Sequence, residues 1–351
     1  MLLYIHIPFC DSKCSYCSFN SYVDKFALRE SYMQALMRQL QFELGRFGAK
    51  AGAIETLFIG GGTPSTVAPE LYRPIFELLR PYLAEEAEIT SEANPNSATP
   101  AWLKGMHDLG VNRISFGVQS FNDEKLKLLA RAHRGREAVA AVKNAKEAGF
   151  EHLSIDLIYA TACDTKALLK HDLETAFSLP IDHISAYALT IEEGTPFADT
   201  PDVAKEKLGL TLWLFETIRS HGFEQYEISN FGRYRSRHNL GYWQYKPYIG
   251  LGCGAVGFLR DTRYYPHSSV EAYIADPLDI REERLSAEEM KSERLFLGLR
   301  SIVGVDPSEL LPEERKRAEF LVDEGKLRYD AGRYYNPDYL LSDELALFIL
   351  A

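Results

Sequence analysis

The feature that most constrains the fold is a sixfold alternation, over about the first 195 residues, between short apolar runs and longer segments with helical periodicity. The apolar runs are predicted strands, because they are short and several end close to Gly, Pro or Asn. They cover residues 3–7, 56–59, 88–93, 113–118, 152–158 and 183–189. Such alternation favours parallel strands joined by right-handed crossovers, so the sequence predicts an α/β fold with a full or partial barrel.

The segments between these runs carry helical patterns. Between the first two strands, Leu28, Tyr32, Leu36, Leu40 and Leu44 recur every fourth residue. This spacing places one apolar stripe on a helix of about five turns. Further helices are predicted near residues 69–83, 122–129, 136–148 and 166–177.

The alternation fades after about residue 195, and two further parts are predicted there. Residues 196–285 contain a helix and then an irregular stretch rich in Tyr, Asn and Gly, which we expect to form loops and short strands over the barrel mouth. Residues 286–351 contain two helical patterns and a hairpin around Ala331 and Gly332, which predicts a small C-terminal α+β domain of winged-helix type. The predicted domains are therefore 1–195, 196–285 and 286–351.

Charge and composition exclude several classes of protein. Thirty-nine basic against fifty acidic residues give a formal charge of -11, which repels a phosphate backbone, so no nucleic-acid partner is expected. No apolar run reaches the roughly 18 residues of a membrane span, and no signal peptide is recognisable. We therefore expect a cytoplasmic protein.

Three of the five cysteines, Cys10, Cys14 and Cys17, follow the first predicted strand with the spacing C-x3-C-x2-C. A structural zinc site normally needs four ligands in two pairs, and neither Cys163 nor Cys253 belongs to a second pair. Three thiolates on one loop instead suit a [4Fe-4S] cluster with one iron left open for a substrate or cofactor. A zinc site and three buried apolar cysteines remain the alternatives.

Several motifs together resemble a known family. They are YIHIPFC at residues 4–10, GGGTPS at 60–65, EANP at 92–95, RISFGVQSF at 113–121 and HNLGYW at 238–243. With the cysteine loop, they are similar to the branch of the radical S-adenosylmethionine (SAM) superfamily that holds oxygen-independent coproporphyrinogen III oxidase and the HemW-type haem chaperones. The resemblance implies a partial (β/α)6 barrel, a [4Fe-4S] cluster on the three cysteines, bound SAM and an electron donor for the cluster.

The resemblance also implies a set of cofactor contacts. Glu92 and Asp156 match contacts of the SAM amine and ribose, and Gln119 and Arg131 match positions that hold a second SAM in the oxidase. Tyr4 and His6 share one face of the first strand and match positions near the cluster and SAM. The implied cofactor-binding residues are Tyr4, Tyr16, Gly61, Gly62, Thr63, Glu92, Gln119, Arg131, Asp156 and His238. Glycines at 60–62 would let the backbone approach bound SAM.

Features of the chain favour the chaperone over the oxidase. In the oxidase a further cysteine stands two residues after the third ligand, whereas Phe19 occupies that position here, and Tyr4 stands too near the start for the oxidase's N-terminal arm. The pattern formed by His238, Asn239, Tyr242 and Trp243 is linked to haem binding in the chaperones. A neutral imidazole is a good axial ligand for haem iron, so His238 is the candidate ligand.

The chain departs from the family pattern at two loops. Residues 160–164 read ATACD where the family usually has Gly-Leu-Pro-Gly-Gln, and Val256 stands where a His is common. Cys163 and Cys253 are expected to be loop or core thiols.

The sequence therefore predicts a haem chaperone of radical SAM type that delivers haem, as cargo, to an acceptor protein. Oxygen-independent coproporphyrinogen III oxidase, acting by radical decarboxylation of propionate side chains, is the first alternative. An iron-sulfur electron-transfer protein that uses no SAM is the second, and the glycine turn and Glu92 argue against it. No catalytic residue is assigned, and cleavage of SAM is left open.

Overall fold

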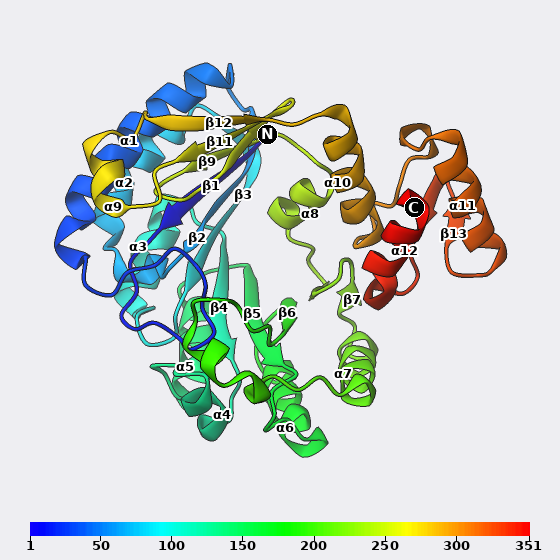
Figure 1. Ribbon diagram of the computed structural model, residues 1–351. Helices are drawn as coiled ribbons and strands as arrows, with labels where there is room; N and C mark the ends of the chain where they lie inside the picture. The colour runs from blue at the N-terminus through cyan, green and yellow to red at the C-terminus, as the bar shows by residue number, and fades with distance from the viewer.

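The computed structural model describes residues 1–351, and its centre is a curved sheet of six parallel strands (Figure 1). The strands pair in chain order, each with the next. They are β1 (Leu2–Ile7), β2 (Ile54–Gly61), β3 (Leu83–Ala93), β4 (Arg113–Gln119), β5 (His152–Tyr159) and β6 (His183–Ala188). The predicted α/β fold with a partial (β/α)6 barrel is confirmed.

Helices connect these strands and cover the outside of the sheet (Figure 1). They are α1 (Arg29–Arg46), α2 (Pro69–Leu79), α3 (Pro100–Leu109), α4 (Asp123–Leu128), α5 (Gly135–Glu147) and α6 (Lys166–Phe177). The predicted end of the second helix at residue 83 is wrong, because Pro81 follows closely and β3 starts at Leu83. Helix α3 was not predicted, although Pro100 opens it and the Thr99 side chain caps it.

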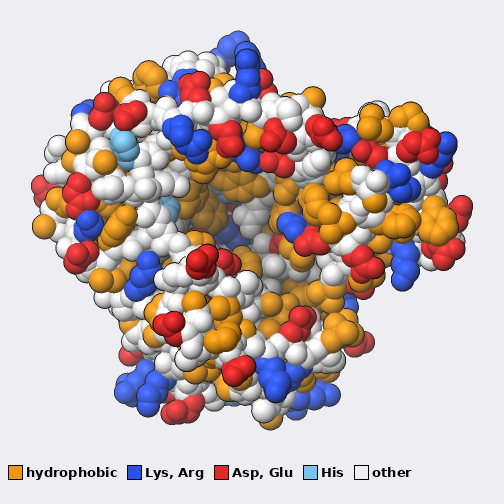
Figure 2. Space-filling view, in the orientation of Figure 1, with side chains coloured by type: hydrophobic (Ala, Val, Ile, Leu, Met, Phe, Trp, Pro, Cys, Tyr) orange, Lys and Arg blue, Asp and Glu red, His pale blue; other side chains and the backbone are white.

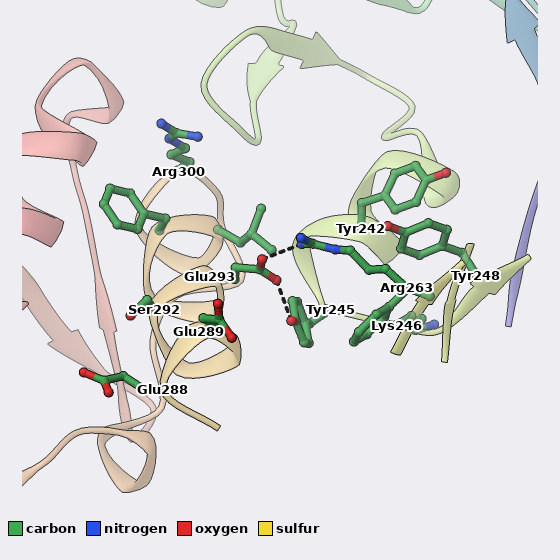
Figure 3. A pocket seen from close by; sticks show the side chains of 13 residues that line it. Tyr242, Tyr245, Lys246, Tyr248, Arg263, Glu288, Glu289, Ser292, Glu293 and Arg300 are labelled. Carbon is green, nitrogen blue, oxygen red and sulfur yellow. Dashed lines mark hydrogen bonds and ion pairs between the residues drawn. The ribbon is translucent and has the colours of Figure 1, made fainter. Parts of the chain in front are cut away.

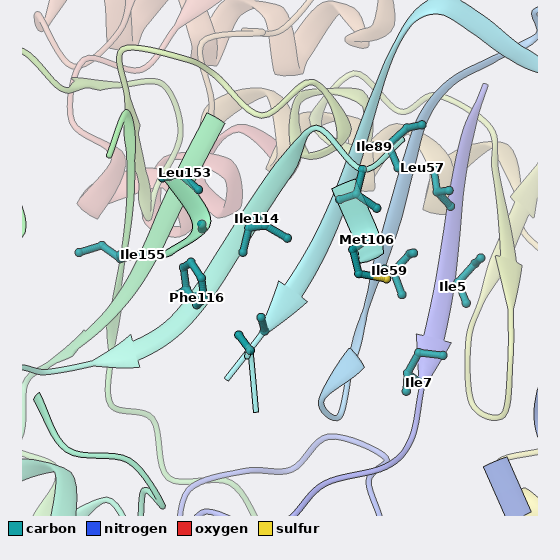
Figure 4. Close-up of a cluster of buried hydrophobic side chains, with 14 of the residues drawn as sticks. Ile5, Ile7, Leu57, Ile59, Ile89, Met106, Ile114, Phe116, Leu153 and Ile155 are labelled. Carbon is teal, nitrogen blue, oxygen red and sulfur yellow. The ribbon is translucent and has the colours of Figure 1, made fainter. Parts of the chain in front are cut away.

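Strand alternation separates the core from the barrel interior. Odd residues of β1 and β2, such as Ile5, Ile7, Leu57 and Ile59, join the apolar core in Figure 4, together with side chains of β3 to β5 and Met106 from α3. The even residues of the same strands point the other way, into the barrel. The barrel interior is therefore free to carry polar and aromatic side chains.

The stretch after residue 195 contains two short 3-10 helices (Pro196–Asp199 and Pro201–Val203) and helix α7 (Leu208–Ser220), and then extends the sheet at both edges. Strands β7 (Glu224–Gln225) and β8 (Asn230–Gly232) continue beyond β6, and β9 (Tyr248–Leu251) runs parallel to β1. Outside β9 come β10 (Gly257–Leu259), β11 (Thr262–Pro266) and β12 (Ile280–Arg284), with α9 (Val270–Ala275) between the last two.

The irregular stretch, at residues 225–257, is expected to form loops and short strands over the barrel mouth, whereas its strands pair with the edges of the sheet. An unpaired edge of β1 would leave its backbone groups without partners, and Ile249 and Leu251 of β9 are fully buried there. Helix α8 (Arg237–Trp243) lies inside the curve of the sheet (Figure 1). The domain boundaries at residues 195 and 285 stay a prediction.

The C-terminal part has its own small core. It contains α10 (Ala287–Leu299), α11 (Pro312–Asp323), the hairpin of β13 (Arg328–Asp330) and β14 (Arg333–Tyr335), and α12 (Ser342–Leu350). The predicted helix pair and hairpin are present, and α12 is an addition. Main-chain bonds of 2.9 Å from Ile228 to Arg300 and from Ile302 to Tyr226 join this part to the barrel. No helix of the chain combines the length and apolarity that crossing a bilayer requires.

A buried ion pair holds the loop at residues 160–164, where the chain departs from its family pattern. The Lys125 ammonium lies 2.6 Å from the Asp164 carboxylate, and both side chains are almost fully buried. The other oxygen of Asp164 accepts a hydrogen bond from the Thr161 main chain at 2.8 Å. The positive φ of Ala160, 60°, lies at the start of the same turn, so Asp164 gives this loop a structural anchor.

We expect Asp164→Ala to lower the free energy of unfolding by about 3–5 kcal/mol, because it leaves the Lys125 charge buried and unpaired. The matched control is Asp108→Ala, which breaks an exposed pair with Lys104 and should cost less than about 1 kcal/mol. Urea denaturation of the two variants and the parent measures both effects. Equal losses would show that the buried pair does not anchor the loop.

Candidate functional site

The cysteine loop begins directly after β1 and is closed at its base by main-chain bonds. Tyr22 donates to Pro8 at 2.7 Å, and Cys10 donates to Tyr22 at 3.0 Å. Within the loop, the amide of Cys17 bonds the carbonyl of Cys14 at 3.2 Å, which makes a tight turn. The loop therefore returns to its starting point and holds its three cysteines over the carboxyl end of the barrel.

The three cysteines line one cavity of about 400 Å³. Nearly all of the predicted site residues line it as well, although they come from five different strands and loops. The full set is Cys10, Cys14, Cys17, Tyr16, Gly61, Gly62, Thr63, Glu92, Gln119, Arg131 and Asp156. Ligand sites of β/α barrels form at this end of the strands, because the loops that follow the strands meet there.

The glycine turn is required by contacts within the protein. Gly61 has a φ of +108°, and a Cβ there would lie 2.4 Å from the His6 ring. A Cβ on Gly62 would lie 2.8 Å from the Ile7 carbonyl oxygen. Besides making room for a ligand, glycines at these positions therefore let the end of β2 pack closely against β1 and the cysteine loop.

Two carboxylates face the cavity without a cation paired to them. The amide of Gly61 donates to Glu92 at 3.1 Å, and the Ser115 hydroxyl donates to Asp156 at 3.3 Å. Removal from water, together with the neighbouring Asp156 charge, raises the pKa of Glu92 to about 8. Removal from water likewise raises the pKa of Asp156. A cationic ligand in the cavity would stabilise both ionised groups.

Polar neighbours surround the cysteine sulfurs. Arg131 Nη1 lies 3.2 Å from the Cys14 sulfur, and the Thr63 hydroxyl lies 3.3 Å from the Cys10 sulfur. The second guanidinium nitrogen of Arg131 donates to Asn94 and to the Gly117 carbonyl, both at 2.7 Å. Hydrogen bonds to ligand sulfurs are one of the means by which proteins set the potential of an iron-sulfur cluster.

The donor set fits a cluster better than a single ion. No three His, Cys, Asp or Glu side chains converge closely enough to hold one metal ion, although the three cysteines share a cavity wall. In a [4Fe-4S] cluster each thiolate binds a different iron, so convergence on one point is not required. The three cysteine side chains, with Arg131 and Thr63 as hydrogen-bond donors, suit such a group.

Tyr4 and His238 lie in a second cavity of about 340 Å³, which is mostly aromatic. Its other lining residues are Phe58, Asn239, Tyr242, Tyr248 and Val256. His6 lies between the two cavities, with its ring nitrogens bonded to the Tyr4 hydroxyl at 3.0 Å and to the Asn20 carbonyl at 2.8 Å. Neither Tyr4 nor His6 lines the cysteine cavity; His6 supports the loop that carries the cysteines.

His238 has one satisfied and one free ring nitrogen. Its Nδ1 lies 2.8 Å from the Thr56 hydroxyl, while Nε2 has no hydrogen-bond partner although the side chain is only 1% exposed. Burial, helped by the charge of Arg113, lowers the pKa of His238 to about 3. The imidazole is therefore neutral at physiological pH, with an unpartnered nitrogen inside the molecule.

Glu88 positions helix α8 and hence His238. Its carboxylate accepts hydrogen bonds from the amides of Arg237 at 2.8 Å and His238 at 2.9 Å, and from the Tyr234 hydroxyl at 2.9 Å. Glu88 and Glu92 are on the same side of β3, four residues apart. One strand therefore supports the aromatic cavity at one end and the cysteine cavity at the other.

Sequence reasoning missed several lining residues. Asn94 holds Arg131 in place, and Tyr187 and Thr190, from the end of β6 and the loop after it, complete the cysteine cavity. Their position at the carboxyl end of a predicted strand is the signal that could have found them. Trp243 of the haem-linked motif lines neither cavity, whereas Tyr242 lines the aromatic one.

A curved sheet of six parallel strands with a three-cysteine loop over a glycine turn is the arrangement expected of a radical SAM protein, and comparisons with known proteins support that class. Residues 4–170 match the family described as the Radical SAM superfamily. The chain is 34% identical over 325 residues to the Bacillus subtilis protein named heme chaperone HemW, which covers 86% of this chain and 84% of the relative. It is 39% identical over 265 residues to the Escherichia coli protein of the same name, covering 73% and 69%.

This chain belongs to the radical SAM superfamily, in the group whose curated members are named heme chaperone HemW. The solved structure of coproporphyrinogen III oxidase (HemN) from Escherichia coli has a TM-score of 0.82 to it, covering 99% of this chain and 89% of that chain at 21% identity. At that identity the likeness shows a shared fold. Membership of the superfamily implies a [4Fe-4S] cluster and SAM.

We expect Glu88→Ala to lower the free energy of unfolding by about 2–3 kcal/mol, because several donors, two of them amides of α8, lose a charged acceptor. The neighbouring Glu86→Ala, on an exposed side chain, should change it by less than about 0.5 kcal/mol. Urea denaturation measures both. If the two variants match, the Glu88 carboxylate does not hold α8 in place.

Proposed function

We propose that this chain is a haem chaperone of radical SAM type, which binds haem at the aromatic cavity and delivers it to an acceptor protein. One observation carries the proposal: the neutral, buried imidazole of His238 lines an aromatic cavity, and its Nε2 has no hydrogen-bond partner. The names of the relatives support it, since they are called heme chaperones. The electron donor for the cluster and the haem acceptor are further partners that the proposal requires.

The surroundings of His238 are those of an axial ligand. When Nδ1 donates its proton to the Thr56 hydroxyl, the lone pair of Nε2 is free for iron. Phe58 and Tyr242 contact the imidazole at ring-centre distances of 5.1 and 4.8 Å, so they can cover an apolar macrocycle beside it. Val256 lines this cavity at the position where a His is common in the family, so His238 is the one imidazole in the lining.

The cysteine cavity supports a cluster and one molecule of SAM. Cys10, Cys14 and Cys17 would hold the cluster, and Glu92 and Asp156 would bind the amine and the ribose of SAM. In the family the bound cluster supplies the electron that cleaves SAM to a 5'-deoxyadenosyl radical. Arg131 already has partners in Cys14, Tyr16, Asn94 and Gly117, so the proposal assigns its guanidinium to the cluster loop and not to a second SAM.

We expect SAM affinity to rise between pH 6 and 8, by up to about tenfold per pH unit. Glu92, with its pKa raised to about 8, must lose a proton before it can pair with the SAM amine, and that cost falls as pH rises. Glu92→Gln should weaken binding and remove this slope. Calorimetric titration of the reconstituted protein with SAM measures both.

Glu192→Gln is the matched control for the Glu92 experiment, since Glu192 is an exposed residue at the rim of the same cavity. It should keep the pH slope of the parent. An affinity that is independent of pH in the parent, or a slope that survives Glu92→Gln, would contradict the assignment of Glu92.

We expect His238→Ala to shift the Soret band of the haem complex and to weaken haem binding by more than 100-fold. Thr56→Val, which removes only the partner of Nδ1, should cost about 10- to 100-fold, as changes behind a metal ligand typically do. Absorption titration with haem measures both. His267→Ala, whose ring pairs with Asp279 on the surface, is the control and should bind as the parent does.

The same preparation separates the chaperone from the oxidase. The parent is incubated anaerobically with coproporphyrinogen III, SAM and a reductant, and the product is analysed by chromatography. Haem uptake without decarboxylation supports the chaperone. Turnover of coproporphyrinogen III with no haem uptake would replace the proposal with the oxidase.

A further inference from the structure

A larger cavity adjoins the aromatic one, on the side of the C-terminal helix α10. It has a volume of about 670 Å³, and Tyr242 and Tyr248 line both cavities. Figure 3 shows it from close by, with α10 on one side and α8 with the neighbouring strands on the other. In Figure 2 a hollow with a largely hydrophobic floor opens at the centre of the molecule. We call the 670 Å³ space the outer cavity and the 340 Å³ space the inner cavity.

Tyr242 and Tyr248 lie where the two cavities meet. Tyr242 and Tyr248 contact each other edge to face at a ring-centre distance of 4.8 Å, and Tyr242 contacts the His238 ring in the same way at 4.8 Å. Pockets for small molecules span about 300–1,000 Å³, so the inner cavity is at the low end of that range. A haem bound at His238, with its four pyrrole rings and eight peripheral substituents, would extend past these tyrosines into the outer cavity.

The walls of the outer cavity suit a flat apolar ligand. Tyr245 and Phe258 line one side, in contact with each other at 4.9 Å between ring centres, and Phe296 and Leu297 of α10 line the other. These aromatic and aliphatic faces continue the lining of the inner cavity. A macrocycle with its iron at His238 would extend between them.

One polar link crosses the outer cavity. Glu293 of α10 accepts a hydrogen bond from the Tyr245 hydroxyl at 2.6 Å and pairs with Arg263 of β11, as the dashed lines in Figure 3 show. The other cations of this lining, Lys246 and Arg300, pair with Glu55 and Asp343 outside it. Arg263 is therefore the cation whose partner carboxylate is itself part of the cavity.

We propose that haem spans both cavities, an inference that rests on the proposed function. Its macrocycle lies between Phe258 and the Phe296–Leu297 face of α10. One of its propionates takes the place of Glu293 as the partner of Arg263. A propionate offers Arg263 the same carboxylate that Glu293 offers now, and the planar guanidinium binds either in two-point fashion. Helix α10 is then the second wall of the haem site. Binding also breaks the link between α10 and the sheet.

The propionate contact is tested by comparing the affinities of two proteins for two ligands. Full-length cluster-loaded parent and Arg263→Gln are titrated with haem and with haem dimethyl ester, in which both propionates are blocked. Arg263→Gln should weaken haem binding by about tenfold or more and leave ester binding unchanged. Arg281→Gln, an exposed arginine of β12 that stacks on Tyr265, is the control and should change neither affinity. Equal weakening for haem and ester would overturn the contact.

The α10 wall is tested by Phe296→Ala and Leu297→Ala. Each should weaken both haem and iron-free protoporphyrin by about five- to tenfold and leave the Soret maximum of the haem complex in place, because the axial ligand is untouched. Leu347→Ala, on the exposed face of α12, should bind as the parent does. Thermal melting and cluster absorbance confirm that each variant is folded.

The outcomes separate this inference from the proposed function. If the parent protein takes up no haem, both this inference and the proposed function are wrong. If His238→Ala shifts the Soret band while Phe296→Ala and Leu297→Ala keep the parent's affinity, haem binding at His238 stands and the outer cavity is not part of its site. Losses in the α10 and Arg263 variants, in the pattern described and with the Arg281 and Leu347 controls unchanged, support the two-cavity site.

Discussion

The close contact of β2 with β1 is the constraint on which the cysteine cavity depends. The amide of Gly62 bonds the Ile7 carbonyl at 2.7 Å, and the amide of Thr63 bonds the Phe9 carbonyl at 2.8 Å. These bonds continue the strand pairing past the end of β1, where the cysteine loop starts, and a side chain at Gly61 or Gly62 would meet protein atoms within 3 Å. They place Thr63 beside the Cys10 sulfur and the Gly61 amide beside Glu92. The glycines are therefore required for the shape of the cavity and are also part of its lining.

The same strands carry both cavities because alternate side chains share a face. On β1, Tyr4 lines the inner aromatic cavity and His6 supports the cysteine loop. On β2, Thr56 holds His238, while Gly60 stands beside Glu92. Because alternate residues of each strand face the barrel interior, the inward-facing residues of the same strands serve both the cysteine cavity, at the carboxyl ends, and the inner cavity, near the middle of the sheet.

Local sequence patterns predicted the parts of this structure that depend on local rules. The six strands follow from short apolar runs, and the cysteine loop from its spacing. The remainder depends on contacts between residues distant in the chain: β9 pairs with β1 across some 246 residues, as Leu2 with Tyr248, and Thr56 meets His238 across 182. The direction of Tyr4 and the outer cavity against α10 follow from such contacts, which no periodicity encodes. Motif resemblance found His238, but only packing shows which of its nitrogens is free.

The two sites differ in the charge that they favour, and this difference sorts their ligands. The cysteine cavity gathers three thiols with Glu92 and Asp156, so it favours iron and a cationic cofactor. The inner cavity has a neutral imidazole and aromatic walls. The outer cavity adds Arg263, paired with Glu293, while its other two carboxylates, Glu288 and Glu289, are exposed to water, so together the cavities favour an apolar ligand that offers Arg263 a carboxylate. Buried Arg113 contributes to both, since its charge lowers the pKa of His238 and opposes the rise in the pKa of Glu92. In a protein of net charge -11, an anionic macrocycle meets less repulsion at a site whose cations balance its carboxylates than at an acidic one.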